Sequence, residues 1–155
     1  MAFVIYVPRS GQIQLSVDLG DNSLSSLPPG QALCLGDATQ GGEFYSEGDS
    51  LSEVEATHLA RFATGAFNEL VAGEAGSEYR VLQDRLGLRP LYLYEKGGAC
   101  AVSDSLWALV QHLKAEGLAP TLNREAFDLQ LASDKFVAEH PFTMDTLVDG
   151  VRVSI

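Results

Sequence analysis

Lysine and arginine are scarce in this chain. It holds 10 of them against 21 aspartate and glutamate residues, which gives a formal net charge of −11. Nucleic acids and anionic membrane surfaces attract basic proteins and repel acidic ones. The composition therefore argues against nonspecific binding to nucleic acid or to anionic lipid, and it predicts an acidic, solvated surface.

Long apolar runs and cysteines are also lacking. No apolar run approaches the length of about 20 residues that crosses a bilayer. Residues 1–8 lack the basic leader and the cleavage site of a signal peptide, so we expect a cytoplasmic protein. The 2 cysteines, Cys34 and Cys100, each lie in an apolar run that is typical of a reduced, buried thiol rather than of a disulfide.

The sequence contains no internal repeat and no low-complexity segment. Its 155 residues, 46% of them hydrophobic, suffice for one domain over residues 1–155 with its own core. Alternating and short apolar runs predict strands, with a hairpin at the start and loops at 18–30 and 36–50. The predicted strands cover residues 2–7, 12–17, 31–35, 67–71, 79–83, 91–94, 99–102 and the end of the 145–155 tail.

Three helices are predicted between these strands. One follows the capping residues at 49–53 and ends near Gly65, with Leu51, Val54, Leu59 and Phe62 at helical spacing. The second runs from 103 to Gly117, and the third, shorter one covers 122–131. Strands in succession after a helix indicate an α+β fold with mostly antiparallel pairing.

The stretch from Gly65 to Ser105 is predicted to form a β-meander. Residues 79–83 alternate with a period of two, Gly87 and Pro90 suit a turn, and residues 91–94 resume the strand. Asp84, Arg85 and Arg89 flank this turn, and we interpret them as a carboxylate and guanidinium groups that fix it by charge-assisted hydrogen bonds.

Several of these segments resemble the glutamine amidotransferase domain of asparagine synthetase-like proteins, the class II amidotransferases with an N-terminal nucleophile. Gly65-Ala-Phe67 stands in place of the family's Gly-x-Phe-Ala strand, and 84–92 in place of its Arg-Asp-x-x-Gly-x-x-Pro-Leu-Tyr motif. Residues 102–109 are similar to its Ala-Ser-Glu-x-x-Ala-Leu helix start. The structural residues of these motifs are Gly65, Asp84, Arg85, Gly87, Pro90 and Tyr92.

The resemblance implies an N-terminal-nucleophile hydrolase fold, a four-layer αββα sandwich of two antiparallel sheets. It covers about 65–153. Residues 120–155 resemble the lead-in to a synthetase domain, as in β-lactam synthetases and lasso-peptide cyclases, and the 155 residues themselves contain no synthetase domain. No phosphate-binding loop is present, and we expect no cofactor and no metal.

The family's chemistry requires a cysteine directly after the initiator methionine, with its own α-amino group as base. That position holds Ala2. The family's Asn-Gly-Glu-Ile-Tyr-Asn motif is represented only by 41–46, where Gly41, Gly42 and Glu43 remain as weak substrate-binding candidates and Gly41 replaces the oxyanion-binding asparagine.

Other polar residues have structural interpretations as well. His58, His112 and His140 each lack a second metal ligand nearby in the sequence. A dyad of Cys34 with His58, oriented by Asp37, would suffer from apolar neighbours that raise the pKa of the thiol. Trp107, with Leu106 and Leu109, is predicted to be core rather than a recognition patch.

The first hypothesis is a catalytically inactive amidotransferase-like module that binds or scaffolds. Its partner would be a separate asparagine synthetase-type ligase or a peptide substrate, in a biosynthetic or peptide-modification pathway. The alternatives are an N-terminal-hydrolase-type amidohydrolase with a redeployed or internally processed active site, and an N-terminal fragment of a longer ligase. Each of these hypotheses is compatible with a homo-oligomer.

Overall fold

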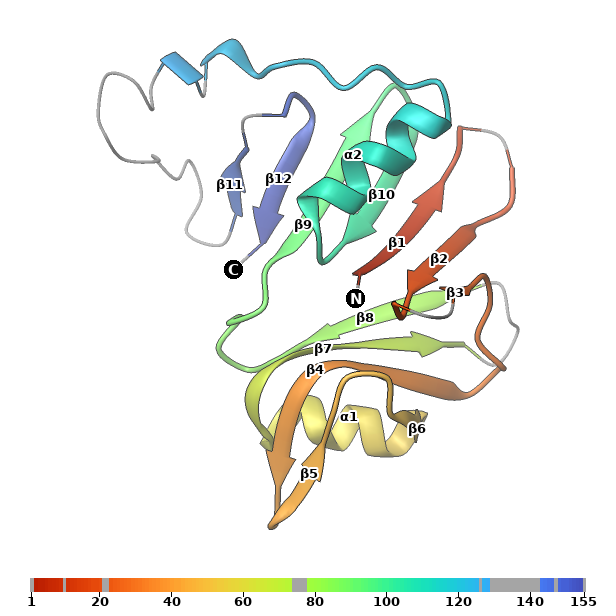
Figure 1. Cartoon of the computed structure of the whole chain (residues 1–155), viewed down its shortest axis with the longest axis vertical. Coiled ribbons are helices and arrows are strands. Elements are labelled where there is room, and N and C mark those ends of the chain that lie inside the picture. The colour runs from red at the N-terminus through yellow and green to blue at the C-terminus, as the bar shows by residue number, and fades with distance from the viewer. Residues whose placement is uncertain are drawn as a thin grey trace.

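The computed structural model describes residues 2–9, 11–20, 23–73, 78–125, 127–128, 143–146 and 148–154. In these residues, two antiparallel β-sheets and two helices form an α+β fold, as the sequence predicts (Figure 1). Neither helix has the length and apolarity that crossing a bilayer requires. The elements are β1 Ala2–Val7, β2 Gln14–Asp18, β3 Ser23–Leu24, β4 Gln31–Gln40, β5 Glu43–Tyr45, β6 Ser50–Ser52, α1 Glu53–Phe62, β7 Thr64–Ala72, β8 Tyr79–Gln83, β9 Leu91–Lys96, β10 Ala99–Ser103, α2 Leu106–Ala115, β11 Thr143–Asp145 and β12 Val151–Ser154.

The seven-stranded sheet is built from the two ends of the described chain. Its strand order is β11-β12-β9-β10-β1-β2-β3. β1 and β2 form the predicted N-terminal hairpin, and β9 and β10 pair around a turn at Gly97 and Gly98. β1 then pairs with β10, so that Val4 lies opposite Ser103. The N-terminal strand therefore lies in the interior of a sheet that strands after residue 90 complete.

The five-stranded sheet comes from one continuous stretch, residues 31–83. Its order is β5-β4-β7-β8, and β6 pairs with β4. The predicted loop at 36–50 is wrong in large part, because β4 continues to Gln40, β5 lies within that segment and β6 begins at its last residue. β4 pairs with β7 from Ala32 to Thr39, and these ladder hydrogen bonds outweigh a glycine-rich, polar composition.

The predicted meander is wrong in one respect. β8 lies in the five-stranded sheet and β9 in the seven-stranded sheet, so residues 84–90 cross between sheets instead of turning within one. Alternation of side chains shows that a strand has two faces, but it does not identify the strand that pairs with it.

Glycine is required where β4 and β7 approach closely. Gly65 has a φ of +142°, and a Cβ added to it would lie 2.1 Å from the carbonyl oxygen of Asp37. Gly36 on β4 has a φ of +115°, and its Cβ would lie 2.4 Å from the carbonyl oxygen of Ala66. The two glycines allow the paired strands to approach this closely without a side chain between them.

Gly65→Ala is therefore expected to lower the free energy of unfolding by at least about 2 kcal/mol, because the methyl group would push the strands apart. Urea unfolding followed by circular dichroism measures this. Gly41→Ala is the matched control: Gly41 has a φ of +60° with no atom close to its Cβ position, so it should lose only about 1 kcal/mol. Equal losses would contradict a steric role for Gly65.

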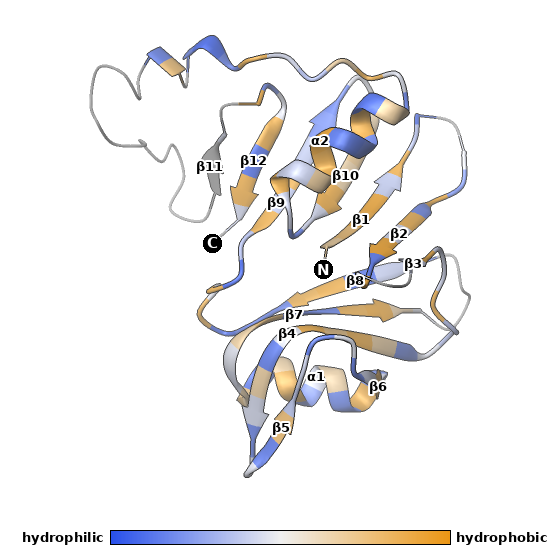
Figure 2. Ribbon diagram, in the orientation of Figure 1, coloured by the Kyte–Doolittle hydropathy of each residue, from blue (hydrophilic) through white to orange (hydrophobic). Residues whose placement is uncertain are grey.

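Three apolar clusters account for the packing. One lies between the sheets and includes Phe3 of β1 with Leu35 and Leu70 of the five-stranded sheet. A second packs α1 on β4 and β7, and a third packs α2 on the seven-stranded sheet. Figure 2 shows apolar residues along β1, β4 and β7, the strands that these clusters share.

Both helices follow predicted capping residues, although α2 begins at Leu106 rather than at the predicted residue 103. Ser52 and Glu55 form a capping box at α1, and their hydrogen bonds lower the pKa of Glu55. Ser105 caps α2. The third predicted helix is helical at residues 124–125 and 127–128, where Phe127 N–H donates to the Asn123 carbonyl oxygen at 3.0 Å; residues 129–131 lie outside the described residues.

The predicted apolar stripes of the helices are only partly buried. α1 buries Ala56 and Leu59, whereas Val54 is 79% and Phe62 63% exposed. α2 buries Leu109 and Leu113, but Trp107 is 72% exposed, so its assignment to the core is wrong. A position two residues from a buried one lies about 200° around a helix, which places Val54 and Trp107 on the outer side.

Candidate functional site

The nucleophile position lies at the first residue of β1. Ala2 pairs with Asp18 of β2, and its side chain is a methyl group. The next backbone amide, Phe3 N–H, donates to Asp104 Oδ1 at 2.9 Å. Asp104 lies between β10 and α2, so the corner between these elements contacts the start of β1. We call this region the N-terminal corner: Ala2, Phe3, Arg89, Asp104 and Glu47.

An ion-pair network occupies the N-terminal corner. Arg89 Nη2 lies 2.7 Å and Nε 3.2 Å from Asp104 Oδ2, and Nη2 lies 3.3 Å from Glu47 Oε1. The side chain of Asp104 is 1% exposed and that of Arg89 is 21% exposed. Two carboxylates therefore hold the guanidinium in place, and the network ties together β1, the 84–90 crossing, the β10–α2 corner and the loop before β6.

Asp84 organises the 84–90 crossing through backbone amides, whereas the sequence suggests guanidinium groups as its partners. Asp84 is buried, and its Oδ1 accepts from Leu86 N–H at 2.9 Å and Leu88 N–H at 3.2 Å, while Oδ2 accepts from Arg89 N–H at 3.3 Å. Gly87 has a φ of +62°, and its N–H donates to the Asp84 carbonyl oxygen at 3.0 Å. The carboxylate thus fixes the crossing.

The other residues of this motif lie around Asp84. Arg85 is exposed and takes no part in the hydrogen bonds of that carboxylate. Gly65, Asp84 and Arg85 line a hollow of about 250 Å³. Pro90 precedes β9, and Tyr92 on β9 packs against the cluster beneath α2. The structure therefore brings Gly65, Asp84 and Arg85 together, with Tyr92 elsewhere.

The structure does not bring Gly41, Gly42 and Glu43 to the N-terminal corner. The two glycines form the turn between β4 and β5, with φ values of +60° and +90°, and Glu43 Oε2 accepts from Tyr45 Oη–H at 2.9 Å. Figure 1 shows this turn at the outer tip of the five-stranded sheet, away from the start of β1.

Neither thiol substitutes for the missing nucleophile. Cys34 is buried in β4, and burial, followed by the charges of Glu69, Asp49 and Asp37, raises the pKa of its thiol to about 12. Cys100 was expected to be buried, but it is exposed, because its side chain faces an open hollow beside the β9–β10 hairpin. It pairs with Val7, at the opposite end of β1 from Ala2.

The histidines form no dyad with a cysteine in the described residues. His58 Nδ1 lies 2.7 Å from Gln40 Nε2 on the outer side of α1, and its ring contacts that of Phe62 at 4.8 Å. The ring of His112 packs edge-on against that of Tyr6 at 5.1 Å. His140 lies outside the described residues. In the described part of the chain, no three His, Cys, Asp or Glu side chains are grouped so as to hold a metal ion.

Two buried polar residues were not predicted from the sequence. Asn68 and Glu69 on β7 are both fully buried, and in the described structure their side-chain amide and carboxylate atoms have no hydrogen-bond partner. They point to opposite faces: Glu69 lies opposite Cys34 on the α1 side, and Asn68 faces the other sheet. Burial raises the pKa of Glu69 to about 8. The only sequence signal is an Asn-Glu pair inside an apolar strand.

No protein-family model, curated protein or solved structure matches this chain. In the N-terminal corner, Arg89 is paired with Asp104 and Glu47. The first residue of β1, Ala2, has only a methyl group as its side chain. Such an arrangement can hold segments together and present a surface, but it contains no thiol for covalent catalysis.

Proposed function

We propose that this chain is a catalytically inactive glutamine amidotransferase-like module that serves as a binding or scaffolding domain. The observation that carries the proposal is the N-terminal corner. Ala2 occupies the place where the resemblance requires a cysteine, and the charged groups beside it, Arg89 and Asp104, bind each other.

The finer fold is part of the same proposal. We infer a four-layer αββα sandwich of the N-terminal-nucleophile type. The three apolar clusters support it, since α2 packs on the seven-stranded sheet, the sheets pack on each other, and α1 packs on the five-stranded sheet. A fold of this type does not by itself bring an activity.

The partner we propose is a separate asparagine synthetase-type ligase, or a peptide that such a ligase modifies. The support comes from the C-terminal segment that resembles a lead-in to a synthetase domain. Within it, β12 pairs with β9, and Asp149 forms an ion pair with Lys96. This end of the chain is therefore joined to the sheet that contains Ala2.

Incubation of the purified protein with L-glutamine tests the proposal. We expect neither glutamate nor ammonia above the buffer blank, because no residue supplies both a thiol and a free amine at the start of β1. We also expect no product from Ala2→Cys, since a thiol there would still lack the family's oxyanion-binding asparagine.

Cys34→Ser and Cys100→Ser serve as the controls for redeployed nucleophiles. Product formation by the unaltered protein that either substitution abolishes would overturn the proposal and favour an amidohydrolase with a different nucleophile. Intact-mass spectrometry of the same sample would detect an internal cut, which the processed-enzyme alternative requires.

A further inference from the structure

Glu69 is buried in the apolar layer between α1 and the five-stranded sheet. It lies directly opposite Cys34 of β4 and Leu82 of β8, and residues at paired positions present their side chains on the same face of a sheet. Cys34 and Leu82 both belong to the cluster that packs α1 on this sheet. Glu69 is fully buried, and neither of its carboxylate oxygens has a hydrogen-bond partner in the described structure. A charged carboxylate is therefore costly at this position.

The neighbouring strands offer Glu69 no counter-charge in the described part of the chain. β4 presents the thiol of Cys34, which is neutral because burial raises its pKa to about 12. Arg80 lies two residues before Leu82 on β8 and so on the same face, but its guanidinium forms an ion pair with Glu53 at the start of α1. Burial accordingly raises the pKa of Glu69, and no nearby positive charge opposes this effect.

The helix above Glu69 offers no counter-charge either. The side chains that α1 buries are Ala56 and Leu59, and β6 adds Leu51 to the same cluster. The titratable side chains of α1 are exposed or partly exposed: Glu53, Glu55, His58 and Arg61. Ionised Glu69 would therefore have only apolar groups and a neutral thiol around it.

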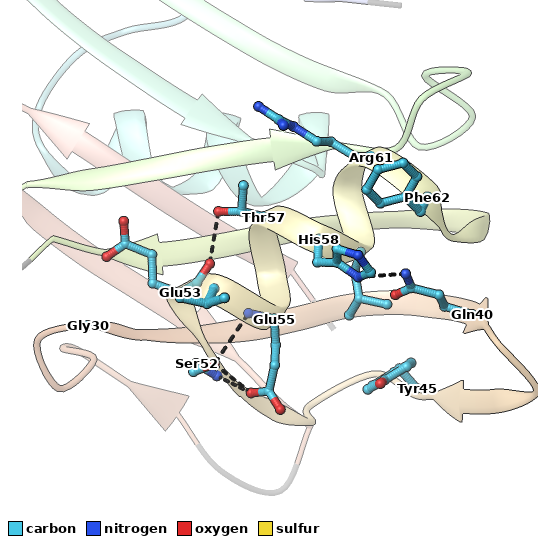
Figure 3. Close-up of a pocket in the computed structure, with 12 residues that line it drawn as sticks. Gly30, Gln40, Tyr45, Ser52, Glu53, Glu55, Thr57, His58, Arg61 and Phe62 are labelled. Atoms are coloured by element: carbon cyan, nitrogen blue, oxygen red, sulfur yellow. Dashed lines mark hydrogen bonds between the residues drawn. The ribbon is translucent and has the colours of Figure 1, made fainter.

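α1 is held on the sheet by few groups. Of its 10 residues, Ala56 and Leu59 are buried, so its apolar contact is small. Figure 3 shows a hydrogen bond that joins the exposed side chain of His58 to Gln40 at the end of β4, and the ion pair of Arg80 links β8 to the first turn. Exposed polar links of this kind contribute little. Elements with few buried contacts are the ones that open locally.

Water can reach Glu69 most easily from the α1 side. β7 pairs with β4 along one edge and with β8 along the other, and its opposite face packs against the seven-stranded sheet. Movement of β7 would break both ladders and the core between the sheets. Displacement of α1 would break only the contacts of one short helix.

We propose that α1 is a pH-sensitive cover: loss of the proton from Glu69 promotes release of the helix from the sheet and exposes Cys34 while both sheets stay intact. The proton passes to solvent, and the carboxylate gains the hydration that the covered state denies it. The sign follows from the raised pKa, because the covered state keeps the proton up to a higher pH than the opened state. This device does not depend on the proposed binding function.

Labelling of Cys34 with the thiol reagent DTNB tests the proposal. The Cys34 thiolate attacks the disulfide of the reagent and releases a coloured thiolate. Cys100→Ser is the background, because Cys100 is exposed and would react at every pH. Dividing each rate by that of the same protein with Glu69→Gln cancels the titration of the thiol itself. We expect this ratio to rise by about 50-fold between pH 6 and pH 8, as a group that titrates near 4.5 when opened and near 8 when covered requires.

Two further measurements separate release of α1 from unfolding of the whole protein and from a general effect of charge. Labelling in low concentrations of urea should be nearly independent of urea, because displacement of one helix exposes little surface, whereas global unfolding depends steeply on it. Glu95→Gln removes an exposed carboxylate from the seven-stranded sheet, and it should leave the labelling rates unchanged.

Three results would overturn the inference: a ratio that stays constant from pH 6 to pH 8, a steep dependence of the labelling rate on urea, or an equal change in Glu95→Gln. Circular dichroism verifies that each variant folds. Glu69→Leu replaces Glu69→Gln if the buried amide prevents folding, since it also removes the titration.

Discussion

Replacing Glu69 by leucine is expected to raise the free energy of unfolding by about 4 kcal/mol at pH 8, and by only about 1 kcal/mol at pH 5.5. Glu69 is fully buried beneath α1, and its carboxylate oxygens have no partner in the described structure. At pH 5.5 the unfolded chain has already lost most of this proton, so both the small gain there and the larger gain at pH 8 come from removing a titration that opposes folding.

The sign of the pH effect follows from the raised pKa. Burial raises the pKa of Glu69 to about 8 in the folded protein, above its ordinary value of 4.5. Between these two values the unfolded chain loses the proton and the folded chain keeps it, so the unfolded state gains stability as pH rises. About 3 kcal/mol of stability should disappear between pH 5.5 and pH 8.

Urea unfolding at several pH values measures both effects. Glu69→Gln is the matched control, because it removes the titration but keeps a buried polar group. It should show the flat pH dependence of the leucine variant but a smaller gain at every pH, because its buried amide still lacks partners. If the difference between the unaltered protein and Glu69→Leu stays constant from pH 5.5 to pH 8, the carboxylate is stabilised in a way that contradicts its buried, unpartnered position.

Asp104→Ala is expected to lower the free energy of unfolding by about 3 kcal/mol. The substitution takes away the closest carboxylate from Arg89, most of whose side chain is buried, and it leaves Phe3 N–H without its acceptor. Glu47 remains, but it is more exposed and its carboxylate oxygen lies farther from the guanidinium. Chemical denaturation gives the magnitude.

Asp104→Asn separates the two contributions. An asparagine can still accept from Phe3 N–H, but it no longer neutralises Arg89, so the loss should be smaller than for Asp104→Ala. Adding Arg89→Met to Asp104→Ala should recover part of the lost stability, because the buried charge then disappears together with its partner. If the double variant loses as much unfolding free energy as Asp104→Ala and Arg89→Met lose together, the two residues do not interact, which would contradict the ion pair.

Local chemistry in the sequence predicted local structure well. Ser52 with Glu55, and Ser105, indicate helix starts because a side-chain oxygen must accept the free amides there. Asp84 and Gly87 indicate a bend for similar local reasons. Short-range hydrogen bonds of this kind depend on residues a few positions apart, and the sequence displays such spacing directly.

Long-range features could not be predicted in the same way. The proximity of Arg89 and Asp104 depends on residues 84–90 crossing from one sheet to the other. Glu47 joins them from a segment whose sequence resembles a loop. The exposure of Val54 and Phe62 depends on how much of the five-stranded sheet α1 covers. Asn68 and Glu69 are buried because β7 is central to its sheet, although their side chains favour water.

The order of the strands has a consequence for how the chain acquires its structure on the ribosome. β4 to β8 are contiguous and pair among themselves, whereas β1 pairs with β10 about a hundred residues later. At roughly 5 to 20 residues per second, β1 waits about 5 to 20 s for that partner. We expect pulsed hydrogen exchange to protect β4 and β7 first, and the edge of β1 that pairs with β10 only when β10 arrives.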